Sequence, residues 1–162
     1  MPLGLKLGDM RFEHLLQVTD PGNPHMPPMS RSELWRGLLL RVESPDRFPL
    51  GPDRCHVRPG ASVDERERSI HYGALHFEDV VKLEPEHRVV FKPEPHEGAV
   101  PVGLAITIEE PAPGGLFLRF IYEAPPLSPE EKPLQGYREQ AWLENDREML
   151  RTLREWQHEG RL

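Results

Sequence analysis

Six short apolar runs followed by one long amphipathic segment constrain the fold of this 162-residue chain more than any other feature. Between residues 53 and 124 the runs are rich in β-branched and aromatic residues and are separated by proline and glycine, which predicts a meander of antiparallel strands. The expected strands lie at 53–58, 64–72, 75–83, 87–93, 101–109 and 116–123. Residues 133–158 then carry apolar side chains at helical spacing, which predicts a long helix.

The segment before the meander predicts one more strand and a helix. RFEHLLQVTD, residues 11–20, alternates between apolar and polar residues and is followed by a turn-rich stretch, as expected of a strand that leads into a loop. SRSELWRGLLLRVES, residues 30–44, then begins with a capping box, because Ser30 is a good N-cap and Glu33 stands three residues later. Pro45 ends this helix, since proline disfavours helical geometry in the residue before it.

This order of elements predicts an α+β fold. A seven-stranded curved antiparallel sheet should wrap around the long C-terminal helix, with one or two short helices between the first and second strands. The chain length suits one domain with a sizeable core. We expect that domain to cover residues 11–162 and to follow a loosely ordered lead-in of residues 1–10.

Charge and cysteine content exclude several classes of partner. The net charge of −7 argues against nonspecific binding of nucleic acid, which requires a clustered basic surface. The sequence contains no apolar run long enough for a signal peptide or a membrane span. Cys55 is the single cysteine and cannot form an internal disulfide, so we expect a cytoplasmic protein. Monomer and homodimer both stay open.

The sequence also lacks the usual patterns for metal and cofactor binding. His71 and His76 are five residues apart in strand-rich sequence, which predicts that they point to opposite faces. HFEDVV, residues 76–81, lacks the second histidine of a zinc-binding helix, and no phosphate-binding or dinucleotide-binding fingerprint is present. We therefore expect neither a metal nor a cofactor.

Three polar residues interrupt predicted apolar faces. His14 lies on the apolar face of the first strand, and Asp146 falls on the apolar stripe of the long helix. An unpaired carboxylate there would be costly, and burial would raise its pKa. Arg68 has the strand parity of an inward-facing residue and is one possible partner of Asp146, while His14 is the other. Such a pair is either structural or functional, because both kinds of ion pair perturb pKa values.

Several segments resemble a known family. The sequence is similar to the AtaL-like domain-of-unknown-function family, within the SRPBCC superfamily of START proteins, birch-pollen allergens and polyketide cyclases. The segments that carry the similarity are FEHLLQVTDP, SELWRGLLLRVESPDRF, TIEEPAPGGLFLRFIYE and AWLENDREMLRTLRE. The resemblance covers nearly the whole chain after residue 10 and implies the helix-grip fold.

The resemblance also implies a cavity between the long helix and the concave face of the sheet. A curved sheet and one helix cannot pack closely everywhere, and apolar pockets with few polar groups are the usual sites for small molecules. The candidate lining residues are Leu104, Ile106, Leu118, Phe120 and Tyr122 from the sheet, Trp142, Met149 and Leu153 from the helix, and the polar residues His14, Arg68 and Asp146. Each of them can equally belong to a closed core.

Three functions remain open on this basis. The first is a protein that binds a small hydrophobic or aromatic molecule without an assigned catalytic residue. The second is an enzyme similar to polyketide cyclases and dehydratases, in which Asp146 and His14 would act as acid and base. The third is a protein-interaction module similar to co-chaperones, which would need an apolar outer face. That face is mostly polar, as at Thr107, Glu109, Arg119 and Glu123, so we rank this function last.

Overall fold

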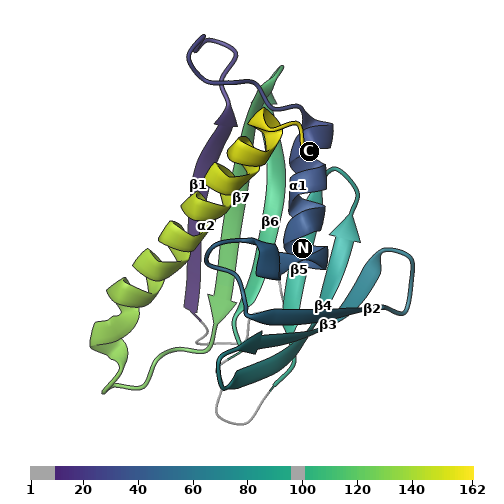
Figure 1. Cartoon of the computed structure of the whole chain (residues 1–162). Coiled ribbons are helices and arrows are strands. Elements are labelled where there is room, and N and C mark those ends of the chain that lie inside the picture. Colours follow the sequence, from purple (N-terminus) through teal and green to yellow (C-terminus); the bar gives the residue numbers. More distant parts are fainter. Residues whose placement is uncertain (1–9, 96–100) are drawn as a thin grey trace.

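The computed structural model in Figure 1 describes residues 10–95 and 101–162. Seven antiparallel strands form one sheet in the order β1-β7-β6-β5-β4-β3-β2. The strands are β1 (Met10–Thr19), β2 (Arg54–Pro59), β3 (Glu65–Tyr72), β4 (Leu75–Glu84), β5 (Arg88–Pro93), β6 (Gly103–Ala112) and β7 (Gly115–Ala124). The helices are α1 (Arg31–Glu43) and α2 (Gln135–His158), with short 3-10 helices η1 (Pro45–Arg47) and η2 (Lys132–Leu134).

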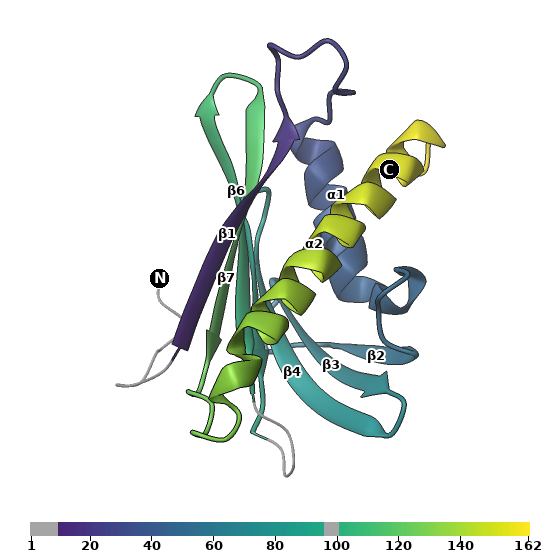
Figure 2. The same cartoon turned by 90° about the vertical axis from the view of Figure 1, so that its left-hand side faces the viewer.

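The predicted α+β helix-grip architecture is confirmed. Figure 2 shows both helices on the same side of the sheet, with β2, β3 and β4 curving beneath them. The first strand pairs with the last, and His14 lies opposite Phe120 in the β1–β7 ladder. The expected lead-in of residues 1–10 lies outside the described residues, apart from Met10, with which β1 begins.

Local sequence signals fix α1 as expected. The Ser30 hydroxyl accepts a hydrogen bond from the Glu33 amide at 3.1 Å, and the Glu33 carboxylate accepts one from the Ser30 amide at 3.0 Å. This capping box satisfies two amides that a helix start otherwise leaves without partners. The helix ends at Ser44, just before Pro45, and its buried residues are Leu34, Trp35, Gly37, Leu38 and Val42.

The C-terminal half of α2 packs against α1 as well as against the sheet. A Cβ atom at Gly37 of α1 would lie 2.7 Å from Leu153 Cδ1, so the two helices approach closely only because residue 37 has no side chain. Leu153 is fully buried, and Trp156 packs in the same apolar core. This half of the helix therefore contributes to a closed core.

The long helix α2 begins slightly later than the sequence predicts. The predicted start at residue 133 differs from the observed start at Gln135, because residues 132–134 form the short helix η2.

Within the described residues, none of the helices combines the length and the apolar character needed to cross a bilayer.

Candidate functional site

A pocket of ≈ 210 Å³ lies between the N-terminal half of α2, the end of α1 and the concave face of the sheet. Eleven of its fifteen lining residues are apolar or aromatic. These are Pro45, Pro52, Ile70, Tyr72, Phe77, Phe91, Pro93, Val102, Leu104, Tyr122 and Trp142. The polar lining residues are Arg41, Arg68, Asp79 and Asn145. Such a lining, mostly apolar with a few polar groups, is typical of small-molecule sites.

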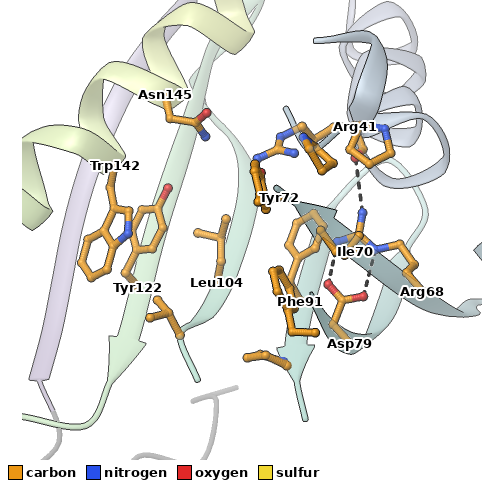
Figure 3. A pocket seen from close by; sticks show the side chains of 15 residues that line it. Arg41, Arg68, Ile70, Tyr72, Asp79, Phe91, Leu104, Tyr122, Trp142 and Asn145 are labelled. Carbon is orange, nitrogen blue, oxygen red and sulfur yellow. Dashed lines mark hydrogen bonds and ion pairs between the residues drawn. The ribbon is translucent and has the colours of Figure 1, made fainter. Parts of the chain in front are cut away.

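Strand register builds one wall of this pocket. Tyr122 on β7 lies opposite Leu104 on β6, and Leu104 in turn lies opposite Phe91 on β5. Because directly opposed residues in an antiparallel ladder share one face, these three side chains form a continuous row across the sheet. In Figure 3, Tyr122 and Trp142 stand on one side of the pocket and the pair of Arg68 and Asp79 on the other.

A buried hydrogen-bond network lies next to this wall. Tyr122 donates its hydroxyl proton to Asp146, with its oxygen 2.8 Å and 2.7 Å from the two carboxylate oxygens. His14 Nε2 lies 2.8 Å from Oδ2 of the same carboxylate. Asp146 is only 2% exposed. The sequence left open whether His14 or Arg68 pairs with Asp146, and the structure shows that it is His14.

Aromatic rings pack around this network. The Trp142 ring stacks on the Tyr122 ring with centroids 4.4 Å apart and planes parallel. The His14 ring stacks on Phe120 at 4.8 Å. Asp146 and His14 are not among the residues that line the pocket, whereas Tyr122 and Trp142 are. Tyr122 therefore contacts both the pocket and the carboxylate.

Burial sets the protonation properties of the network. It raises the pKa of the Asp146 carboxyl, and the hydrogen bonds from His14 and Tyr122 oppose that rise. Burial also raises the pKa of the Tyr122 hydroxyl, and the nearby Asp146 charge raises it further. Tyr122 therefore stays protonated and donates its hydroxyl hydrogen to Asp146. The lone pairs of the Tyr122 oxygen remain available to accept a hydrogen bond on the pocket side.

The raised pKa of Asp146 predicts a pH-dependent effect of the Asp146→Asn substitution. Below pH 3.8, the ordinary value of this carboxyl, both the folded and the unfolded wild type hold the proton. Above it the unfolded state loses the proton first, so the wild type loses stability as pH rises through the folded-state pKa. Asparagine cannot ionise and is spared this loss.

We therefore expect the free energy of unfolding of Asp146→Asn, relative to wild type, to increase with pH above 3.8. The slope can reach at most about 1.4 kcal/mol per pH unit. Urea unfolding of both proteins from pH 4 to 8 measures this difference. Once the pH exceeds the folded-state pKa the difference levels off, and a difference that does not rise anywhere in this range would contradict a raised pKa.

The inward-facing Arg68 pairs with a residue that the sequence did not indicate. Its Nε lies 2.9 Å from Oδ1 of Asp79 and its Nη2 lies 2.6 Å from Oδ2. Its Nη1 donates to the Val42 carbonyl oxygen at 3.0 Å, and its Cζ lies 5.0 Å from the centre of the Phe91 ring. The proposed pair of Arg68 with Asp146 is therefore wrong, because Asp79 stands directly opposite Arg68 in the β3–β4 ladder.

The predicted cavity residues divide into three groups. Four of them line the pocket, namely Arg68, Leu104, Tyr122 and Trp142. Five are buried in the hydrophobic core and are not among the lining residues, namely Ile106, Leu118, Phe120, Met149 and Leu153. The remaining two, His14 and Asp146, form the buried hydrogen-bond network. The pocket thus lies nearer to β3, β4 and β5 than the sequence suggested.

One further expectation is wrong. His71 and His76 do not point to opposite faces, because they belong to different strands of one hairpin and lie directly opposite each other. Their rings stack with centroids 4.4 Å apart. Within residues 10–95 and 101–162, no three His, Cys, Asp or Glu side chains gather in a way that could hold a metal ion.

A curved antiparallel sheet that holds one long C-terminal helix, with a pocket between the two, defines a helix-grip protein. The model of the AtaL family, described as acetylaranotin biosynthesis cluster protein L, matches residues 16–160. The chain therefore belongs to the AtaL family, which confirms the resemblance seen in the sequence. A search of curated proteins found no significant match.

Solved structures with the same fold include two aromatase/cyclases and Ara h 8.0201. The di-domain aromatase/cyclase StfQ of the steffimycin biosynthetic pathway aligns with a TM-score of 0.67 at 15% identity, over 90% of this chain and 49% of StfQ. The Zhui aromatase/cyclase from Streptomyces sp. R1128 has a TM-score of 0.62 at 10% identity, over 91% and 95%. Ara h 8.0201 has a TM-score of 0.63 at 10% identity, over 90% and 98%.

These likenesses establish the fold, and the chain spans about half the length of the di-domain protein StfQ. The family match and these shared folds agree with the resemblance to the SRPBCC superfamily seen in the sequence.

Proposed function

We propose that this protein binds a small hydrophobic or aromatic molecule in the pocket between α2 and the sheet. The observation that carries the proposal is the ≈ 210 Å³ pocket with its mostly apolar lining. Pockets for drug-sized ligands usually measure about 300–1,000 Å³, so a ligand with one or two rings fits this one best. The row of Tyr122, Leu104 and Phe91 across the sheet offers a surface against which such rings can pack.

The alternative of a cyclase or dehydratase acting through Asp146 and His14 has weaker support. Catalysis requires an acid and a base within hydrogen-bond reach of the ligand. Here both oxygens of the Asp146 carboxylate accept hydrogen bonds from protein groups, and neither Asp146 nor His14 is among the residues that line the pocket. A structural role for Asp146 explains this arrangement, because a buried carboxylate needs such partners.

The alternative of a protein-interaction module is also less well supported. On the outer face of the sheet, Arg119 forms ion pairs with Glu109 and Glu13, so charges bridge β6, β7 and β1. These charges occupy the face on which a contiguous apolar patch, which marks many interaction surfaces, would have to lie.

A neutral two-ring probe tests the proposal directly. We expect 2-naphthamide to bind the wild type with a dissociation constant between about 1 µM and 1 mM, as its dozen or so non-hydrogen atoms allow. The Leu104→Trp variant, which fills the middle of the pocket wall, should weaken binding at least about tenfold, or 1.4 kcal/mol. Isothermal titration calorimetry measures both affinities.

A matched control places the same ring outside the pocket. Leu15 is 45% exposed on the opposite face of β1, so Leu15→Trp should leave the affinity unchanged. Equal binding by wild type and Leu104→Trp would place the ligand elsewhere. Native mass spectrometry of the protein purified from its own host would then identify the natural molecule.

A further inference from the structure

One positive charge in the pocket has no counter-ion among the residues that the structure describes. Arg68 and Asp79 cancel each other through two hydrogen bonds, of 2.9 Å and 2.6 Å. The other charged lining residue is Arg41, in the last turn of α1. In the described part of the chain, no carboxylate forms an ion pair or a hydrogen bond with its guanidinium. The charged side chains in the lining thus sum to one positive charge.

The position of Arg41 gives this charge access to the pocket. The side chain is half-buried, and its Cζ lies 6.0 Å from the centre of the Phe48 ring. Burial raises the pKa of Asp146, and the positive charge of Arg41 opposes that rise. It opposes the rise at Tyr122 in the same way. The field of Arg41 therefore reaches across the pocket to the side formed by α2 and β7.

A polar group from the other helix accompanies Arg41. In Figure 3, Arg41 enters from α1 and Asn145 from α2, on the helix side of the pocket, whereas Leu104 and Phe91 lie on the sheet side. A guanidinium binds a planar carboxylate through two parallel hydrogen bonds, which are about twice as strong as neutral ones. The amide of Asn145 can donate a further hydrogen bond. The pocket is therefore apolar on one side and suited to an anion on the other.

We propose that the pocket selects small aromatic or hydrophobic molecules that carry a carboxylate, with Arg41 as the residue that binds the carboxylate. This inference rests on the proposed function, since it names the class of ligand for the same pocket. The ring of the ligand lies against Tyr122, Leu104 and Phe91, and its carboxylate points toward the two helices.

Two ligands of equal shape test the inference. 2-Naphthoate is ionised at pH 7, whereas 2-naphthamide has the same rings and no charge. We expect the wild type to bind 2-naphthoate at least tenfold more tightly than 2-naphthamide in isothermal titration calorimetry at low salt. Arg41→Met keeps the length of the side chain and removes the charge. It should weaken 2-naphthoate binding at least tenfold and change 2-naphthamide binding less than twofold.

A second arginine of the same helix provides the control. Arg36 is exposed and is not among the lining residues of this pocket, so Arg36→Met changes the net charge equally and should leave both affinities unchanged. If the wild type binds both ligands equally, the inference is overturned while the proposed function stands. If it binds neither, the proposed function fails and the inference with it. The preference of the wild type decides this even if Arg41→Met does not fold.

Discussion

Replacing Asp79 by alanine is expected to lower the free energy of unfolding by about 3–5 kcal/mol. Arg68 and Asp79 are each only 4% exposed, so the substitution leaves a buried guanidinium without its counter-ion. The remaining hydrogen bonds, from Nη1 to the carbonyl oxygens of Val42 at 3.0 Å and Arg41 at 3.5 Å, are too weak to offset this loss, since even a good hydrogen bond from a charged group is worth about 1.5–3 kcal/mol. Urea unfolding at pH 7 measures the change.

An exposed ion pair between the same two strands is the matched control. Lys82 Nζ lies 3.8 Å from Glu65 Oε1, and the Lys82 side chain is 51% exposed. Exposed pairs contribute about 0–1 kcal/mol, so Lys82→Ala should change stability by less than about 1 kcal/mol. If Asp79→Ala costs no more than Lys82→Ala, the buried pair does not stabilise the fold as we describe.

A double variant that lacks both charges tests whether the loss of stability comes from the unpaired guanidinium. Buried ion pairs replaced by apolar residues of similar volume are often neutral or stabilising. We therefore expect the double variant Arg68→Met, Asp79→Leu to lie within about 2 kcal/mol of wild type, the difference being mainly the lost hydrogen bond to Val42. A double variant as unstable as Asp79→Ala would show that the loss does not come from the unpaired guanidinium.

The partner of Arg68 was within reach of the sequence. Gly73 adopts a positive φ of 54° in the turn between β3 and β4, and Tyr72 lies opposite Leu75 across it. Counting back from such a two-residue turn places Asp79 opposite Arg68. The same count places His76 opposite His71. The alternation of side chains within one strand predicts neither pair, because it does not contain the register between the two strands, which the turn sets.

Other features of the fold could be predicted because they depend on local signals. Prolines, glycines and the capping box at Ser30 mark the ends of elements, and alternation identifies the inner face of β6 and β7. The hydrogen bond between Asp146 and Tyr122 is different, because it depends on how α2 lies across the sheet. The packing of many side chains sets the position of α2 on the sheet, and the periodicity of apolar residues in the sequence does not predict it.

The location of the pocket also depends on a contact that the sequence does not reveal. The apolar stripe of α2 identifies which face is buried, but not what covers each part of it. α1 packs against the C-terminal half of α2 and helps to close the core there. Trp142 and Asn145, which lie nearer to the N-terminus of α2, remain beside the pocket. Met149 and Leu153 are therefore in the core although they share the stripe with Trp142.

Leu153→Ala tests whether this half of the interface is closed. Leu153 is fully buried and packs against α1 at Gly37, where a Cβ atom would lie 2.7 Å from its Cδ1. Removing a leucine side chain from such a site costs about 2–5 kcal/mol. We expect a loss of this size in urea unfolding, with unchanged affinity for 2-naphthamide because Leu153 does not line the pocket.

A second substitution at Gly37 makes this prediction sharper. In the wild type, Gly37→Ala forces the Leu153 side chain to move, and such overpacking costs about 1–3 kcal/mol, which outweighs the gain of up to about 1 kcal/mol in helix propensity. In the Leu153→Ala background the clash is absent, so the same substitution should stabilise the protein. The sign of the effect of Gly37→Ala therefore reverses between the two backgrounds only if the two helices are in direct contact. A stabilising effect in both would mean that the space over Gly37 is open, and that the hollow between helix and sheet extends to this end of the molecule.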